Sequence, residues 1–431
     1  MNKIVYIVIG LFAVLLILNG CEEFLGSKGD ATTDEIFEEG RKDPTAEVEE
    51  VAYAALVPFW EGFDNPTDVY VGFDELVYVT DATGLHVLDQ AGRHYDTIEI
   101  KGGATSVTQD RLLNIYVTAR YDTVITSDPN VDSSITWNLP AIYKIKNANG
   151  AGPVQYVDTL IQPFMDNSRN VSPATRHFRL NRSRTDNEEL VDITGIGVLA
   201  NNDIYVSRKG PRNRTGEAQA PDNTVLIFTE NQNTGKMENT SQIRSLHPTT
   251  PSYRSGIDIN DIVTLVGPPQ RVNMTSDIHF LVAQGGPEKD IPFRVLWINA
   301  VETIDGIEYR PNSRFFVNAD DTSRARSFLY DEYKFKNPTG LAYSADARGH
   351  IFVVDADTDS LYLFQSNGFE GINPPAGFSE NKAINVSFGG TGSGPRQFNN
   401  PNGVAYFNEV VYVADKGNNR IARYKLSTDF E

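Results

Sequence analysis

Short apolar runs rich in β-branched and aromatic residues recur along most of the chain, and each is followed by a polar turn and a second apolar run. The clearest case lies near the C-terminus. A Pro-Asn-Gly turn at 401–403 precedes the apolar run Val410–Ala414, the polar turn Asp415–Asn419 and the alternating segment Ile421–Tyr424. A continuous apolar run suits a buried strand, and Asp, Asn and Gly are typical turn residues. The pattern predicts antiparallel strands with a buried strand in the middle of each unit.

The same order recurs five more times. Two copies keep the turn residues, at Asn65–Leu88 and Asn337–Phe364. Three others keep only the strand pairs, which are Ile115–Ala119 with Ile142–Ile145, Ile204–Ser207 with Val225–Phe228, and Ile278–Ala283 with Val295–Ile298. One such unit cannot bury both of its faces alone, so repetition predicts a ring in which neighbouring units cover one another.

The C-terminal copy reads Pro-Asn-Gly-Val-Ala-Tyr and then Val-Val-Tyr-Val-Ala-Asp-Lys-Gly-Asn-Asn-Arg-Ile. This resembles an NHL repeat, which is one blade of a β-propeller. The resemblance implies an all-β fold, a six-bladed β-propeller of four-stranded blades, which we expect over residues 51–431. It also implies a recognition platform in most members of the family and an enzyme in a minority.

The last copy has only three strands before residue 431. An open sheet edge invites pairing with other chains, so the ring needs a fourth strand here. The apolar segment Val51–Trp60 directly precedes the first copy, and we predict that it closes the last blade. A short helix packed against the ring is the alternative, which Pro58 disfavours.

The N-terminus carries Lys3, an apolar run from Ile4 to Leu18, and Gly20 before Cys21, the single cysteine of the chain. This is similar to a bacterial lipoprotein signal. The similarity implies a signal peptide over residues 1–20 that is removed, and a lipid attached to Cys21. The alternative is an uncleaved helix with a buried thiol.

Residues 22–50 hold 11 acidic and 3 basic residues and few apolar ones. Such a composition is typical of a solvated tether, which we place at 21–50. Glu22 and Glu23 after the cysteine resemble surface-exported lipoproteins of Bacteroidota. The resemblance implies anchoring in the outer membrane with the propeller outside the cell, and the periplasmic face is the alternative.

The chain has a net charge of −19, which disfavours nucleic acid and anionic lipid as partners. Against this background, basic residues gather in two acid-free stretches, at 168–185 and 207–216. Propeller geometry places both stretches on one rim with the long hairpin Arg120–Pro140. Arg208 and Lys209 also align with the turn acids Asp81, Asp355 and Asp415 and the residues after them.

We therefore expect a ligand site on this loop-rich face, built from basic side chains and an aromatic ring. The basic groups would form forked contacts to a carboxylate, sulfate or phosphate on a glycan or peptide, and the ring would stack on a sugar. A protein partner is a further possibility for the same face. The alternative is a set of solvated loops whose arginines pair with surplus acids. The candidate residues are Arg120, Trp137, Arg176, Arg179, Arg208, Lys209 and Arg212.

Signals for catalysis or metal binding are few. Asp355, Asp357 and Asp359 alternate as in a calcium loop, but they align with the plain turn at Asp415. The histidines show no paired spacing suited to zinc, and no Gly-x-Ser-x-Gly elbow is present. We therefore expect a monomeric, membrane-anchored recognition platform without a cofactor. The alternatives are a lyase or hydrolase acting at the channel mouth, and a docking subunit of an outer-membrane complex.

Overall fold

The computed structural model describes most of the chain after residue 50. The described ranges are 51–128, 131–162, 188–211, 213, 221–243, 258–268, 278–285, 293–318, 321–325, 328–331, 333–374 and 382–430. The expectations for the signal peptide, Cys21 and the tether lie outside these residues. No helix among the described residues is long and apolar enough to span a membrane.

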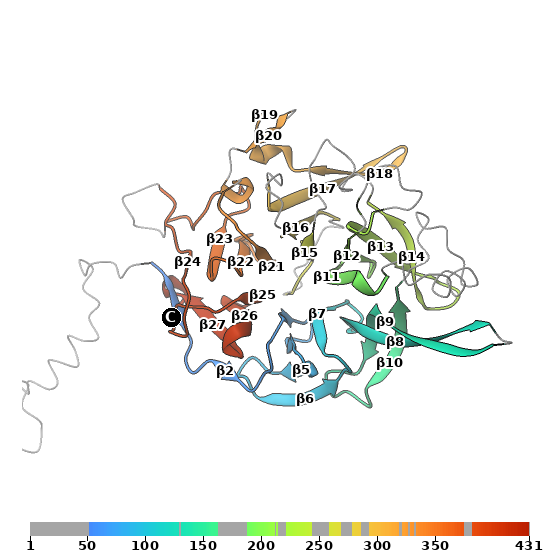
Figure 1. Ribbon diagram of the computed structural model, residues 1–431. Helices are drawn as coiled ribbons and strands as arrows, with labels where there is room; N and C mark the ends of the chain where they lie inside the picture. Colours follow the sequence, from blue (N-terminus) through green and yellow to red (C-terminus); the bar gives the residue numbers. More distant parts are fainter. Residues whose placement is uncertain are drawn as a thin grey trace, which may run out of the picture. The chain divides into compact units, whose positions relative to one another are not determined.

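Six antiparallel sheets follow one another along the chain and confirm the predicted six-bladed β-propeller (Figure 1). Every strand pair expected from the sequence forms the middle of one blade. Blade 1 is β3 (Asp68–Val71), β4 (Val77–Thr80), β5 (Gly84–Leu88) and β6 (His94–Glu99); blade 2 is β7 (Ala104–Gln109), β8 (Ile115–Asp128), β9 (Val131–Lys146) and β10 (Gln155–Ile161); blade 3 is β11 (Asp192–Val198), β12 (Ile204–Lys209), β13 (Thr224–Glu230) and β14 (Met237–Gln242).

The second half of the chain repeats this order and adds a small hairpin, β19 (Phe316–Asn318) with β20 (Asp321–Ala325). Blade 4 is β15 (Ile259–Thr264), β16 (Phe280–Gln284), β17 (Val295–Thr303) and β18 (Gly306–Pro311); blade 5 is β21 (Pro338–Tyr343), β22 (Ile351–Asp355), β23 (Ser360–Phe364) and β24 (Phe388–Gly389); blade 6 begins with β25 (Pro401–Phe407), β26 (Val410–Asp415) and β27 (Arg420–Leu426).

The first strand of each blade lies innermost and contacts the first strands of both neighbouring blades. These contacts run from β3 to β7, β11, β15, β21 and β25, and then from β25 back to β3. The ring in Figure 1 is therefore continuous, and blade 6, in red, adjoins blade 1, in blue. Six first strands thus surround one central channel.

The N-terminal segment of the propeller closes blade 6, as predicted. β1 (Tyr53–Ala55) and β2 (Trp60–Glu61) both pair antiparallel with β27, with Tyr53 opposite Leu426 and Trp60 opposite Ile421. Between them, the Leu56 N–H donates to the Arg423 carbonyl at 2.8 Å. The two ends of the described chain therefore share one sheet, which removes the open edge of β27.

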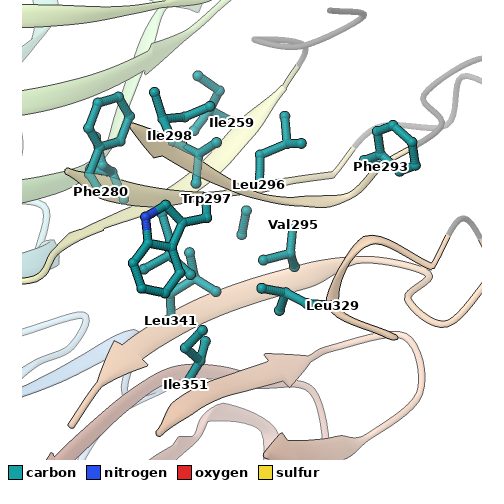
Figure 2. Close-up of a cluster of buried hydrophobic side chains, with 14 of the residues drawn as sticks. Ile259, Phe280, Phe293, Val295, Leu296, Trp297, Ile298, Leu329, Leu341 and Ile351 are labelled. Carbon is teal, nitrogen blue, oxygen red and sulfur yellow. The ribbon is translucent and has the colours of Figure 1, made fainter. Parts of the chain in front are cut away.

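The second strand of each blade is buried on both faces, because it lies between two neighbouring sheets. All residues of β4, β16 and β22 are buried, which explains why these strands are continuous apolar runs rather than alternating ones. The largest cluster fills the space around blade 4 and includes Trp297 and Phe280 (Figure 2). Trp60 and Trp297 are both core residues, as expected from their apolar surroundings.

We expect that loss of the Tyr53 ring opens the closing strand. Tyr53 is 3% exposed and contacts the rings of Phe352 and Phe388 at centroid distances of 6.3 and 6.2 Å. Truncation of a large buried ring typically costs about 3–5 kcal/mol, so Tyr53→Ala should lower the free energy of unfolding by about 3 kcal/mol in denaturant titrations. Ala54→Ser is the matched control, because Ala54 is exposed on the same strand. Equal stability of the two variants would mean that β1 does not hold the ring closed.

Candidate functional site

A repeated β-bulge at the start of the first strand shapes the mouth of the central channel. The register with the second strand shifts by one residue in blades 2 to 6, at Thr105, Thr194, Asn260, Thr339 and Asn402. Thr67 holds the equivalent place just before β3 and donates its N–H to the Thr80 carbonyl. A bulge turns the extra residue out of the ladder, so six small polar side chains reach the same level of the channel.

These bulged residues hydrogen-bond from one blade to the next. All but Thr105, which bonds Thr118 of its own blade, donate the side chain to a main-chain carbonyl at the start of the following blade, at distances of 2.6 to 2.9 Å. Five of the six junctions carry this bond among the described residues: Thr67 to Ala104, Thr194 to Ile259, Asn260 to Pro338, Thr339 to Pro401, and Asn402 to Thr67. The belt ties the blades together where their main-chain groups would otherwise face the channel unpaired.

Above this belt lies a cavity of about 420 Å³, which we call the central cavity. Residues from all six blades line it, and most of them carry amide, hydroxyl or charged groups. Its amides are Asn260, Asn337, Asn400 and Asn402, its hydroxyls include Thr67, Thr105, Thr194 and Thr339, and its charged groups are Asp68, Asp192, Asp261, Arg120, Lys209 and Lys416. A concave site with convergent polar groups is the usual form of a small-ligand site.

Two aspartates from opposite blades, Asp68 of blade 1 and Asp261 of blade 4, form the floor of the central cavity. Each carboxylate accepts one N–H from its own strand and one from the next blade. Asp68 accepts from Val69 at 2.8 Å and Val107 at 3.0 Å, and Asp261 accepts from Ile262 at 2.8 Å and Leu341 at 2.7 Å. We refer to these two residues as the acid pair.

Glycine in the preceding blade makes room for each member of the acid pair. Gly403 precedes Asp68 around the ring, and a Cβ at that glycine would lie 2.6 Å from the Asp68 Cα. Gly195 precedes Asp261, and its Cβ would lie 2.7 Å from Asp261 Oδ1. Both contacts are far below van der Waals distance, so a side chain at Gly403 or Gly195 would collide with the neighbouring blade.

Burial raises the pKa of both members of the acid pair. Loss of hydration is the largest cause for Asp68, and it outweighs the hydrogen bonds from Val107 and Val69 to raise its pKa to about 7. For Asp261 the same burial acts first, and the negative charge of Asp68 raises the pKa further. A buried carboxylate is costly, and a nearby like charge adds to that cost.

Three basic residues occupy one register position in their blades and line the mouth of the central cavity. Arg120, Lys209 and Lys416 each follow the residue that pairs with the first strand just before its bulge, in blades 2, 3 and 6. Blades 1, 4 and 5 have Ala82, Gly285 and Ala356 there. We call Arg120, Lys209 and Lys416 the basic rim.

The three side chains of the basic rim differ in how many hydrogen bonds and ion pairs they already form within the protein. Arg120 lies 2.9 Å from Asp192 Oδ1 and also donates to the carbonyls of Asn138 and Glu189. Lys209 donates to Asn260 Oδ1 at 3.4 Å. Neither Lys209 nor Lys416 has an ion pair within the part of the chain that the structure describes. The two lysines are therefore the groups at the rim that are best placed to meet an anion.

Arg208 is a correction to the predicted site. It is 0% exposed, and its guanidinium donates to the carbonyls of Asp222 at 2.9 Å and Pro221 at 3.2 Å. Asp355 and Asp415 hold the same place in their blades, and Asp81 lies at the corresponding strand end in blade 1. These buried carboxylates accept N–H groups of the segment that enters each blade. Arg208 thus replaces a structural acid and fastens its own hairpin.

Trp137 is also placed differently from the prediction. It is 2% exposed and packs with Leu139 and Ile161 at the base of the β8–β9 hairpin. Hydrophobic burial has drawn the ring inward, so it has no open face on which a sugar could stack. Beyond this residue, strands β8 and β9 continue outward from the ring of blades (Figure 1).

The three carboxylates that alternate as in a calcium loop, Asp355, Asp357 and Asp359, accept hydrogen bonds from different groups. Asp355 accepts the N–H groups of Lys336, Asp357 and Thr358, whereas Asp359 accepts from Asn400 in the next blade. No group of three or more His, Cys, Asp or Glu side chains converges anywhere in the described residues. The hydrogen bonds of Asp355 and Asp359 stabilise the blade turn and its contact with the next blade, and the three carboxylates do not face one common point.

The remaining predicted site residues, Arg176, Arg179 and Arg212, lie outside the described residues. Conversely, our sequence interpretation missed Asp68, Asp261 and Lys416. Lys416 directly follows the turn acid Asp415, just as Lys209 follows Arg208, so alignment of the blades contained this signal. Asp68 likewise stands where Gly340 and Gly403 stand in their blades, and that deviation marks a side chain added at the channel.

The fold and the central cavity define this chain as a six-bladed β-propeller with its candidate site at the mouth of the channel. Residues 398–424 match the family model of the NHL repeat, which confirms the resemblance seen in the C-terminal copy. The chain is thus a β-propeller that carries an NHL repeat in its last blade. No curated protein matches it.

Solved structures of similar architecture come from several bacteria. An auxiliary nutrient binding protein from Bacteroides thetaiotaomicron is 9% identical, with 85% of this chain and 70% of that chain covered and a TM-score of 0.46. Another, from Bacteroides ovatus, is 11% identical, with coverages of 88% and 78% and a TM-score of 0.45. Virginiamycin B lyase from Staphylococcus aureus is 12% identical, with coverages of 88% and 100% and a TM-score of 0.41. Likenesses of this size assign no function to the chain.

The raised pKa of Asp68 predicts a specific dependence of stability on pH. Since the folded pKa of about 7 lies above the ordinary value of 3.8, the folded protein keeps a proton that the unfolded chain releases. The stability that this proton contributes is present below about pH 4 and is lost as the pH rises through about 7. The slope is at most about 1.4 kcal/mol per pH unit.

Denaturant titrations between pH 4 and pH 8 test this expectation. In Asp68→Asn the free energy of unfolding should fall less steeply with rising pH than in the wild type. Asp305→Asn is the matched control, because Asp305 is exposed on the β17–β18 turn. Parallel curves for the wild type and Asp68→Asn would show that Asp68 ionises normally.

Proposed function

We propose that this protein is a binding protein whose site is the central cavity, and that the basic rim recognises an anionic group of its ligand. The observation that carries this is the repeated placement of Arg120, Lys209 and Lys416 at one register position around the cavity mouth. Basic side chains at the mouth of a concave site, in a chain with a net charge of −19, oppose the charge of the rest of the molecule.

The lining of the cavity supports a small ligand rich in hydroxyl or amide groups. Four asparagines and four threonines offer both donors and acceptors, and such groups orient a polar ligand within a pocket. A volume of about 420 Å³ lies within the usual range of small-ligand sites. We therefore assign the ligand to the glycans or peptides that carry a carboxylate, sulfate or phosphate.

The second part of the proposal concerns location. The apolar run from Ile4 to Leu18 and the small residue before Cys21 support a lipid anchor. The acidic residues that follow support display outside the outer membrane. An anchored propeller would then hold its cavity where it meets ligands from the surroundings.

The two lysines of the basic rim should contribute most of the affinity for the anionic group. We expect the double variant Lys209→Ser/Lys416→Ser to bind sulfated or phosphorylated glycans at least about tenfold more weakly, because each charged hydrogen bond is worth about 1.5–3 kcal/mol. Binding on an array of such glycans, followed by calorimetry at two salt concentrations, measures the loss. The double variant should also show a weaker salt dependence.

The matched control is Lys236→Ser/Lys382→Ser, which removes two exposed lysines outside the cavity and causes the same change in net charge. Equal binding by the two double variants would refute the role of the rim. Failure of the wild-type protein to bind any anionic glycan or acidic peptide would refute the proposed function itself.

The anchor has its own test. Cys21→Ser in the full chain, expressed in a bacterium that processes lipoproteins, should move the protein from the membrane fraction to the soluble fraction, because the attached lipid is lost. Protease added to intact cells then distinguishes the two faces of the outer membrane, since only a surface-displayed propeller is cleaved. Retention of Cys21→Ser in the membrane fraction would contradict the lipid anchor.

A further inference from the structure

The charge of the acid pair is unbalanced at the floor of the central cavity. Asp68 and Asp261 accept main-chain N–H groups, and neither has an ion pair among the described residues. The other charged groups that line the cavity are Asp192, Arg120, Lys209 and Lys416. Of these, Asp192 and Arg120 pair with each other. The cavity therefore holds two carboxylates at its floor and two lysines at its mouth.

The channel narrows directly below the acid pair. A second, much smaller cavity of about 50 Å³ lies there, and both aspartates line it as well. Its walls combine an apolar residue from each blade with the hydroxyl groups of Tyr70, Ser106, Thr108 and Thr264; the apolar residues include Val69, Val107, Ile196, Ile262, Leu341 and Val404. A ligand that enters from the mouth therefore meets the acid pair at the inner end of the central cavity.

Each carboxylate of the acid pair retains accepting capacity toward the channel. An ionised carboxylate offers about four lone-pair sites; main-chain N–H groups take two in each aspartate, and the Ser106 hydroxyl takes a third in Asp68. An ammonium group has three donors in a compact, fully charged head. Its positive charge would offset the repulsion that Asp68 exerts on Asp261.

We propose that the acid pair binds the primary ammonium group of a zwitterionic ligand, whose anionic group meets Lys209 and Lys416. This inference rests on the proposed function and narrows it to amine-bearing acids, such as sulfated amino sugars and peptides with a free amino terminus. Separation of the two charges along the channel makes the site directional, with the amine entering first. A ligand without the amine would leave the acid pair uncompensated.

The small number of acids favours an ammonium group over a calcium ion. Calcium takes six to eight oxygen atoms, whereas magnesium keeps several waters and needs only one or two carboxylates. Among the described residues, no third acid or imidazole joins the acid pair. An ammonium group needs only three acceptors, and binding of a divalent ion is the competing outcome that the experiment below includes.

The inference also predicts a pH dependence. Burial raises the pKa of the acid pair, so a proton competes with the ammonium group for the same carboxylates. An α-amino group has a pKa of its own of about 8, so affinity for an amine should be highest between about pH 7 and pH 8 and should fall toward pH 6 as the carboxylates take up protons, while affinity for a ligand without the amine should stay level. Both ligands contact the same basic rim. The difference between their affinities therefore reports on the acid pair alone.

The experiment compares probes that differ only in acetylation of the amine. Glucosamine 6-sulfate is paired with N-acetylglucosamine 6-sulfate, and the dipeptide Ala-Asp with N-acetyl-Ala-Asp. Calorimetry with the wild-type protein at about pH 7.5, where most of the amine is protonated, should show that the free amine of at least one pair binds about tenfold or more tightly than its acetylated partner. The pair that shows the preference distinguishes an amino sugar from a peptide.

Asp68→Asn and Asp261→Asn should each lower the affinity for the free amine at least tenfold and leave that of the acetylated partner within about twofold. Unchanged binding of the acetylated partner shows that the cavity is intact in the variant. Asp305→Asn is the control for charge. If either variant fails to fold, the comparison of the two probes on the wild-type protein, at about pH 6 and about pH 7.5, decides the question alone.

The possible outcomes separate the two proposals. If acetylated and free probes bind equally, the acid pair does not recognise an amine, and the proposed function stands without this inference. If no probe of either pair binds, the inference fails, and binding on the array of anionic glycans decides the proposed function separately. A calcium-dependent rise in the melting temperature that Asp68→Asn abolishes would assign the acid pair to a metal ion and overturn the inference.

Discussion

The pairing of β1 and β2 with β27 is the contact on which the rest of the molecule depends. A propeller blade is a sheet with two apolar faces, and only a closed ring covers both faces of every blade. Without this pairing, β27 would present an unpaired edge, and the apolar seam between blades 5 and 6, which includes Tyr53, would be exposed. Closure also brings six first strands to one axis, and the central cavity exists only because they meet there.

The belt of hydrogen bonds below the cavity shows how the ring satisfies its polar groups. Small polar residues at the bulges join one blade to the next, and the glycines that follow leave space for close packing. Asp68 and Asp261 use this space differently, because they place carboxylates where Gly340 and Gly403 place only a hydrogen atom. Burial of two like charges is unfavourable, and sites of this kind are common where proteins bind or transform ligands.

The basic rim shows that one position in the repeat can serve stability in one blade and recognition in another. The strand end beside it holds a structural acid in three blades and the buried Arg208 in a fourth. One residue further on, the side chain leaves the sheet and faces the cavity, so Lys209 and Lys416 are open to a ligand whereas Arg208 is not. Of the basic residues predicted for the site, Arg120 and Lys209 line the central cavity, whereas Arg208 is buried in its own blade.

The sequence by itself determined the six blades, their order and the closing strand. Apolar runs, turn residues and repetition are local properties, and each blade is built from residues that are close together in the chain. Only the tertiary structure decided which side chains reach the site. Trp137 and Arg208 turned inward, because burial and hydrogen bonding depend on what surrounds them. Asp68 and Asp261 met at the channel because ring closure brings blades 1 and 4 to opposite sides of one axis, which no local pattern encodes.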